Sequence, residues 1–237
     1  MEMSPHTPSS AWLLWLLWWL SFLTPPSEAS PPLNSTLLFD SGAPSFSLRN
    51  CSCSTPIRDC SEALANSVCR CHTVLRSALP PAGLREEGLL TVWVKEEWVL
   101  QEVLNRSTVA HLRLSFCGER PTHSQYLSLL GLQTLRVHSP HAPYPTQDIS
   151  ITPPADFEAP SSSTSSSSIH VTFLDLSVLN GLSALKAYSV LGPPPHTFSQ
   201  HFPHLHLPPA PSLSGTPEAP VDHQDWTAES LLLTFIY

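Results

Sequence analysis

Alternating apolar and polar residues predict a series of short strands along this chain. Residues 89–94 (LLTVWV) and 169–176 (IHVTFLDL) are rich in β-branched and aromatic residues, and residues 110–117 (AHLRLSFC) alternate with a period of two. Residues 132–137 continue this pattern. The apolar residues 231–237 also predict a strand, because a free tail of that composition would tend to aggregate.

Between these strands, three segments have the features of short helices. In residues 96–104, apolar side chains recur four positions apart, as they do on one face of a helix. Residues 124–130 begin with a serine and are followed by Gly131, and both are typical capping residues. Residues 181–190 predict a third short helix. Strands that alternate with helices indicate an α/β fold class.

The spacing of the strands leaves two arrangements open within that class. Val92, Leu112 and Leu135 mark strand centres that lie 20 and 23 residues apart, whereas a βαβ crossover needs about 30 residues or more. Units this short are typical of leucine-rich repeats, and the patterns around Leu112 and Leu135 match the strand part of such a repeat. The cysteine spacing from Cys51 to Cys60 also resembles the cap that begins extracellular repeats. The alternative is a small disulfide-stapled α/β domain without repeats.

The first 29 residues have the features of a secretory signal peptide. Residues 11–24 (AWLLWLLWWLSFLT) form a mostly apolar run, which is too short for a bilayer because a spanning helix needs about 20 apolar residues. The small residues Ser27 and Ala29 suit a cleavage after Ala29. No lysine or arginine precedes the run, so a short uncleaved signal anchor is the alternative. No later stretch is long enough to span a membrane.

We expect the remainder of the chain to divide into three parts. Residues 30–138 form the predicted cysteine-rich α/β core. Residues 139–168 are dominated by serine and proline and predict a disordered linker. Residues 169–237 form a more loosely held C-terminal segment, which contains a proline- and histidine-rich loop over residues 193–220 and the terminal strand.

The cysteines predict a disulfide framework in the core. An even number of cysteines behind a signal peptide predicts three disulfides, with fifteen possible connectivities for six residues. Cysteines separated by a single residue rarely pair with each other, because the backbone between them is too short. The two residues of each Cys-x-Cys pair should therefore have different partners. The six positions are Cys51, Cys53, Cys60, Cys69, Cys71 and Cys117.

Composition and charge exclude some classes of partner. The chain has a formal net charge of −8. Removal of residues 1–29 would leave 17 acidic and 11 basic residues, a net charge of −6. No run of basic residues occurs, so we expect neither nucleic acid nor an anionic membrane as a partner.

Three positions match the acceptor pattern for N-glycosylation. They are Asn34 (NST), Asn50 (NCS) and Asn105 (NRS). We expect Asn34 and Asn105 to be exposed and glycosylated. Asn50 adjoins a cysteine that we expect to be bridged, which makes it the weakest of the three predictions.

Two other chemistries are compatible with the sequence. His196, His201, His204 and His206 lie within eleven residues, and imidazoles can bind zinc or copper. A proline-rich segment gives no fixed ligand geometry, however, so a solvated loop is the simpler interpretation. A secreted hydrolase would need a catalytic triad that sequence alone does not identify, because the usual nucleophile, zinc-protease and nucleotide-binding motifs are absent. We predict no catalytic residue, metal or cofactor.

Taken together, several of these segments resemble one protein family, the exosomal polycystin-interacting proteins. The resemblance extends over most of the chain beyond residue 33, and the cysteine block contributes most to it. The matching segments are 34–39 (NSTLLF), 49–60 (RNCSCSTPIRDC), 64–66, 69–75, 112–115, Cys117, 131–136, 173–175, 183–189 and 234–237.

This resemblance implies a function that the residues alone do not indicate. It implies a secreted, exosome-associated, non-enzymatic binding glycoprotein that self-associates as a homodimer. Its implied partner is a polycystin-type membrane receptor. The resemblance does not identify the residues that contact this receptor.

Overall fold

The structure, a computed structural model, describes most of the chain beyond residue 35. The predicted signal peptide (1–29), Asn34 and residues 152–168 of the predicted linker lie outside the described residues. The described residues are 36–40, 47–58, 60, 62–81, 83–117, 125–140, 143–151, 169–192, 195–208 and 231–237.

Strands dominate the described residues, and they form one eleven-stranded sheet. The strands are β1 (Thr36–Asp40), β2 (Ser47–Cys53), β3 (Cys69–Leu75), β4 (Arg85–Val94), β5 (Ser107–Phe116), β6 (Tyr126–Leu130), β7 (Thr134–His138), β8 (Thr146–Ser150), β9 (Ile169–Asp175), β10 (Ala187–Gly192) and β11 (Leu231–Ile236). The helical segments are short: α2 (Glu62–Val68), the 3₁₀ helices η1 (Arg76–Ala78) and η4 (Leu176–Asn180), the π-helix η2 (Val99–Leu104) and α3 (Pro195–His201).

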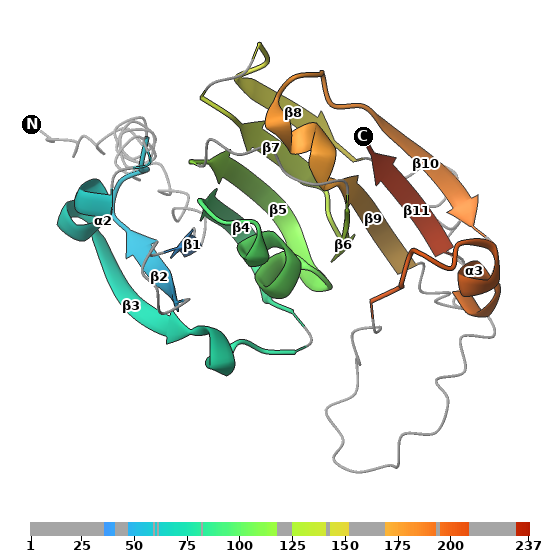
Figure 1. Ribbon diagram of the computed structural model, residues 1–237, viewed down its shortest axis with the longest axis horizontal. Coiled ribbons are helices and arrows are strands. Elements are labelled where there is room, and N and C mark those ends of the chain that lie inside the picture. The colour runs from blue at the N-terminus through green and yellow to red at the C-terminus, as the bar shows by residue number, and fades with distance from the viewer. Residues whose placement is uncertain are drawn as a thin grey trace, which may run out of the picture. The chain divides into compact units, whose positions relative to one another are not determined.

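Four parallel strands, in the order β1, β4, β5 and β7, form the middle of the sheet. Figure 1 shows β4 and β5 side by side. Their register places Leu90, Leu112 and Leu135 in one row across three strands. Antiparallel strands extend this block on both sides, with β2 and β3 beyond β1 and β8 beyond β7.

The sheet forks along one edge of β5. The start of β5 pairs with the end of β6, and the remainder of β5 pairs with β7. The turn between β6 and β7 requires a left-handed conformation at Gly131 (φ 67°), which glycine adopts at little cost. One branch of the fork continues from β6 through β9 and β11 to β10. The other branch ends at β8 among the described strands.

The main core lies against one face of β4, β5 and β7 and also contains residues of the β6 branch. Alternate residues of the strands point into it, because side chains of a strand alternate between faces. The π-helix η2 adds four buried side chains, Val99, Leu100, Val103 and Leu104. The opposite face of β4, β5, β7 and β8, which we call the outer face, therefore carries the intervening residues.

A second, aromatic cluster packs on the β6 branch. Phe173 of β9 is fully buried, and its ring lies 5.5 Å from that of Phe235 and 5.7 Å from that of Phe198. Phe198 belongs to α3, so this helix covers the sheet through stacked rings. Aromatic pairs at such distances stabilise the fold beyond the burial of their area.

The three disulfides lie together at the other end of the sheet. Cys51–Cys71 and Cys53–Cys69 join residues directly opposite each other on β2 and β3, with Cα atoms 4.0 Å apart in both. Cys60–Cys117 joins the segment before α2 to the residue after β5. All six cysteines contact one cluster around Phe39 and Trp93. The prediction of three disulfides, with different partners within each Cys-x-Cys pair, is confirmed.

The predicted α/β fold class, with or without leucine-rich repeats, is wrong. The structure is mostly β-sheet and does not repeat. The strands around Val92, Leu112 and Leu135 are parallel neighbours, as a repeat would require. Their connections differ from each other, however, because η2 joins β4 to β5 whereas strand β6 lies between β5 and β7.

Several predicted elements are confirmed and others are wrong. The strands expected in residues 89–94, 110–117, 132–137, 169–176 and 231–237 all form, and residues 99–104 are helical. The helix predicted in residues 124–130 is instead strand β6. The helix predicted in residues 181–190 is also wrong, since η4 ends before Gly181 and β10 begins at Ala187. Strand β8 lies inside the range predicted as a linker.

The predicted boundary at residue 138 does not interrupt the sheet. Strand β9 pairs with β6, and the terminal strand β11 lies between β9 and β10. Residues 34–237 accordingly form one unit by their contacts.

Candidate functional site

Strand β10 forms one end of the sheet and presents apolar side chains to solvent. It pairs only with β11 among the described strands. Tyr188 is 50% exposed, Val190 44% and Leu191 59%. The neighbouring Tyr237 is 49% exposed, and its ring lies 5.9 Å from that of Tyr188. We call Tyr188, Val190, Leu191 and Tyr237 the β10 edge.

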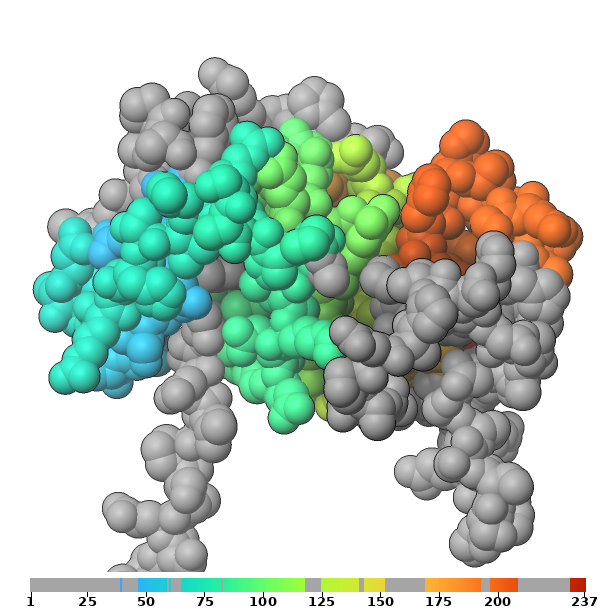
Figure 2. Space-filling view, turned by 90° about the horizontal axis from the view of Figure 1, so that it is seen from below, coloured from blue at the N-terminus to red at the C-terminus, as the bar shows by residue number. Residues whose placement is uncertain are grey.

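Stacked rings connect the β10 edge to the interior. Tyr188 lies directly opposite Phe235 of β11, with ring centroids 5.1 Å apart. Phe235 in turn stacks on the buried Phe173, which contacts α3 through Phe198. In Figure 2, the orange residues, which include α3, lie at the surface of the molecule. The exposed Tyr188 is therefore held by a rigid aromatic row, which reduces the entropy lost when a partner binds it.

Two of the edge strands of the sheet, β3 and β10, differ in how they are protected against pairing. Natural edge strands usually carry charges, prolines or bulges that prevent another strand from pairing with them. Strand β3, at the far end, carries the exposed Arg70 and His72. Strand β10 (AYSVLG) has no charged residue and no proline, and its register with β11 is continuous. Its outer edge is therefore suited to pairing with a further strand.

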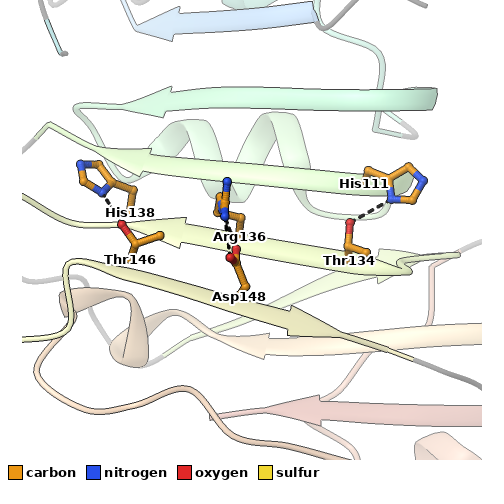
Figure 3. A network of polar contacts seen from close by, with 6 residues as sticks. All are labelled: His111, Thr134, Arg136, His138, Thr146 and Asp148. Carbon is orange, nitrogen blue, oxygen red and sulfur yellow. Dashed lines mark hydrogen bonds and ion pairs between the residues drawn. The ribbon is translucent and has the colours of Figure 1, made fainter. Parts of the chain in front are cut away.

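A ladder of polar side chains covers the outer face of β5, β7 and β8 (Figure 3). Arg136 binds Asp148 through two hydrogen bonds, of 2.5 Å from Nε and 2.6 Å from an Nη atom. His111 and His138 each contact a threonine hydroxyl through Nδ1, at 2.9 and 3.0 Å. The full ladder consists of His111, Arg113, Ser115, Thr134, Arg136, His138, Thr146, Asp148 and Ser150.

Interactions within this ladder shift the pKa values of Asp148 and Arg136. The hydrogen bond from Arg136 lowers the pKa of the Asp148 carboxyl below its usual 3.8, and the positive charges of Arg136 and Arg113 act in the same direction, while slight burial opposes them. The same hydrogen bond raises the pKa of Arg136. Asp148 thus stays ionised at any physiological pH.

Substitution of Asp148 by asparagine tests the energetic weight of this pair. We expect Asp148→Asn to lower the free energy of unfolding at neutral pH by less than about 1 kcal/mol, because both partners are exposed. A lowered pKa in the folded state stabilises the protein above the usual pKa, and this contribution is lost as the pH falls through the folded value. Urea unfolding should therefore show a small difference from wild type near neutral pH and none well below pH 3.8. A difference that grew on acidification would contradict this assignment.

Two of the four predicted histidines and Asn105 meet around one small pocket. His204 and His206 line a pocket of about 200 Å³ together with Asn105, Arg106 and Tyr126. No group of three or more metal-ligating side chains occurs within the described ranges. The positive charge of Arg106 in this pocket would also oppose a cation. His201 is exposed on α3, and the side chain of His196 lies outside the described residues.

The predicted glycosylation sites fall in different surroundings. Asn105 follows η2 and is half-buried, and its Oδ1 accepts a hydrogen bond of 3.0 Å from the backbone N–H of Ser128. Asn50 lies on β2, opposite His72 of β3 and beside the Cys51–Cys71 bridge. Asn34 lies outside the described residues. Nothing in these contacts tests glycosylation, so all three sites stay predictions.

Neither surface was predicted from the sequence. For the outer face, a signal was present, because an arginine occupies the same place in Leu112-Arg-Leu114 and in Leu135-Arg-Val137. Their alignment side by side depends on strand register, which sequence alone does not provide. The β10 edge gave no signal, because residues 181–190 predicted a helix.

Comparison with known proteins identifies the family. No helix in the described segments is both long and apolar enough to cross a membrane. The fold matches no solved structure. The sequence profile described as "Exosomal polycystin 1 interacting protein" matches residues 7–221, which is most of the chain. The resemblance inferred from the cysteine block and the flanking segments is thereby confirmed, and the chain belongs to the exosomal polycystin 1 interacting protein family.

Proposed function

We propose that this chain is a secreted, exosome-associated, non-enzymatic glycoprotein that binds a polycystin-type membrane receptor through the β10 edge. The observation that carries this proposal is the unprotected apolar edge of β10. Membership of the family supports the choice of partner, since the family description names polycystin 1. The three disulfides agree with an oxidising, extracellular compartment.

The proposed binding mode is addition of one receptor strand to β10. An edge strand offers unpaired backbone N–H and C=O groups, and a partner strand that pairs with them gains main-chain hydrogen bonds. Side chains next to this strand give specificity, and exposed tyrosines frequently contribute much of the binding energy at interfaces. Tyr188 and Val190 would contact the partner on one face of the sheet, and Leu191 on the other.

A pair of matched leucine substitutions tests this mode. Leu191→Lys places a charge on the β10 edge, where the side chain is 59% exposed, so folding should be unaffected. Leu75→Lys makes the same change at the end of β3, where the leucine is 55% exposed. We expect Leu191→Lys to weaken binding of a purified receptor ectodomain by about tenfold or more, because it would place an unpaired charge in the interface that binding must desolvate. Leu75→Lys should change the dissociation constant by less than about twofold.

Biolayer interferometry with the immobilised ectodomain gives the comparison. Equal loss of binding in both variants would count against the β10 edge, as would a Leu191→Lys variant that binds like wild type. Light scattering on the same samples identifies a second outcome. If Leu191→Lys converted a dimer to a monomer and left receptor affinity unchanged, the occupant of the edge would be a second copy of the chain.

Glycosylation at Asn105 is part of the same proposal. The hydrogen bond to Ser128 engages Oδ1 and leaves Nδ2, the atom that carries an N-linked glycan. Asn105→Asp removes the acceptor and keeps an oxygen in place for this hydrogen bond, so the variant should fold. We expect the secreted Asn105→Asp protein to migrate faster than wild type by one glycan. If enzymatic deglycosylation shifts both proteins equally, Asn105 carries no glycan.

A further inference from the structure

Hydrogen bonds fix the position of Asn105 at the wall of the small pocket. The backbone N–H of Ser128 donates to Oδ1 of Asn105 at 3.0 Å, and the backbone N–H of Arg106 donates to the carbonyl of Ser128 at 2.8 Å. Arg106 has a left-handed φ of 68°, which is uncommon for a residue with a side chain. These contacts therefore hold the turn between η2 and β5 against strand β6, with the Asn105 side chain beside the pocket.

Another wall of the pocket is the segment of residues 204–206. Leu205 is 8% exposed and packs in the aromatic cluster of the β6 branch, which anchors this segment. The Ser128 hydroxyl donates to the carbonyl of His206 at 3.5 Å. The side chains of His204 and His206 are exposed and line the pocket. The pocket thus lies between the η2–β5 turn, strand β6 and a segment that follows α3.

Tyr126 adds an aromatic surface to this pocket. Its side chain is 46% exposed and lines the pocket. Tyr126 and Ser128 lie on the same face of β6, because side chains of a strand alternate between faces, and Ser128 is the residue that binds Asn105. A tyrosine offers an apolar ring as well as a polar hydroxyl. The pocket therefore combines an apolar surface with polar groups close to Asn105.

The chemistry of the lining matches one sugar ring. Amide, imidazole and hydroxyl groups can both donate and accept hydrogen bonds, as the hydroxyls of a sugar require, and a pyranose presents C–H groups that pack on an aromatic face. The volume of about 200 Å³ is below the range of about 300 to 1,000 Å³ usual for drug-sized ligands. No acidic side chain occurs among the described lining residues. Their polar side chains are those of Asn105, Arg106, Gln125, Tyr126, Ser128, His204 and His206.

The attachment atom for such a sugar already lies at the pocket. Nδ2 of Asn105 has no hydrogen-bond partner among the described residues and is not buried. Asn105 also begins an acceptor pattern for N-glycosylation. A sugar bonded to Nδ2 is held next to the pocket, so its effective concentration there is high. A dissolved sugar would also lose its translational freedom on binding, which favours the chain's own glycan as the occupant.

We propose that the first N-acetylglucosamine of a glycan on Asn105 lies in this pocket against the ring of Tyr126. This inference rests on the glycosylation of Asn105 proposed above. The sugar would contact both strand β6 and residues 204–206, and would therefore stabilise the attachment of this segment to the sheet. Because the pocket fits a single ring, the remainder of the glycan would extend into solvent.

Thermal unfolding of the secreted protein, with each glycan trimmed by an endoglycosidase to one N-acetylglucosamine, tests this contact. Tyr126→Ala should lower the thermal midpoint by about 2 to 4 °C more in the trimmed protein than in the Asn105→Asp background, which lacks the sugar at this site. Comparison of the two backgrounds cancels the direct cost of losing the ring. The matched control is Tyr144→Ala, since Tyr144 is 45% exposed and does not line the pocket. It should lower the midpoint equally in both backgrounds.

The rate of enzymatic glycan release from the native, untrimmed protein gives a second measurement. An amidase must reach the bond between Nδ2 and the first sugar, so a sugar held in the pocket slows release. Tyr126→Ala should speed release by about two- to tenfold, the range for loss of one aromatic contact, and Tyr144→Ala should not. Mass spectrometry of the peptide that contains Asn105 reports release at this site alone.

The outcomes separate this inference from the proposal on which it rests. An Asn105 peptide without any glycan would contradict the glycosylation of Asn105, and would overturn the inference with it. If the glycan is present, equal effects of Tyr126→Ala in the two backgrounds would overturn the pocket assignment alone. A release rate that Tyr126→Ala leaves unchanged would also overturn it. Receptor binding at the β10 edge is independent of either result.

Discussion

Replacement of Cys60 by serine is expected to abolish secretion of this protein. Cys60 and Cys117 are 57 residues apart in sequence, and their bridge joins the segment before α2 to the end of β5. No paired strands hold these two positions together, whereas Cys51–Cys71 and Cys53–Cys69 lie within the hydrogen-bonded β2–β3 pair. Loss of a native disulfide from a small secreted domain typically costs about 2 to 5 kcal/mol, which is a large fraction of the usual stability.

The length of the closed loop makes this bridge the most important of the three. In the chain-entropy account, closing a 57-residue loop stabilises by about 1 kcal/mol more than closing a 16-residue loop. We therefore expect the double variant Cys60→Ser/Cys117→Ser to have a lower thermal midpoint than Cys53→Ser/Cys69→Ser. The double variants also leave no unpaired thiol, so they separate lost stability from retention caused by a free cysteine.

Immunoblots of cell and medium fractions measure the secretion of each variant. Deletion of Ser161 to Ser168 serves as the control, and we expect it to leave secretion unchanged because a serine run contributes little to a core. Normal secretion of the Cys60→Ser protein would contradict the stabilising role of this bridge. Reactivity of all six cysteines towards a thiol reagent in the non-reduced protein would contradict the whole framework.

Phe173→Ala is expected to be strongly destabilising. Phe173 is 0% exposed and stacks on both Phe235 and Phe198. Truncation of a buried phenylalanine costs about 3 to 5 kcal/mol, because burial is lost and a cavity forms. For a chain of this length, that cost corresponds to a fall in the thermal midpoint of about 10 °C. Loss of this ring also removes the surface on which α3 packs.

Phe202→Ala provides the matched control at the exposed end of the same row of rings. Phe202 is 41% exposed and contacts Phe198 with centroids 5.1 Å apart. Its truncation should cost about 1 kcal/mol. Limited proteolysis should cut the Phe173→Ala variant near α3 sooner than either wild type or Phe202→Ala. Equal thermal midpoints for the two variants would show that the aromatic cluster does not hold α3 on the sheet.

Most of the strands were predictable from the sequence, but their order and pairing in the sheet were not. Residues 89–94 and 110–117 combine β-branched residues with alternation, which local sequence is sufficient to recognise. Strand β6 (YLSLL) was predicted as a helix because Ser124 and Gly131 are typical capping residues. Four of its five residues are buried, and burial on both faces removes the period of two that would have indicated a strand. The order of the strands, and the fork at β5, depend on pairings between residues far apart in sequence.

The same limit applies to the candidate sites. The chemistry of the disulfides followed from cysteine number and spacing, although the connectivity needed the fold. Asp148 fell in a range predicted as a linker, because the proline and serine residues around it gave no strand signal. Its pairing with Arg136 therefore emerged only when β8 was placed beside β7.

Hydrogen–deuterium exchange on the secreted protein, with and without the receptor ectodomain, tests the central claim most directly. A strand that adds to β10 would form hydrogen bonds with its unpaired amides, and such amides exchange more slowly. We predict that receptor binding slows exchange in residues 187–192 and leaves β3, at the other end of the sheet, unchanged. Receptor binding with unchanged exchange in residues 187–192 would contradict the account.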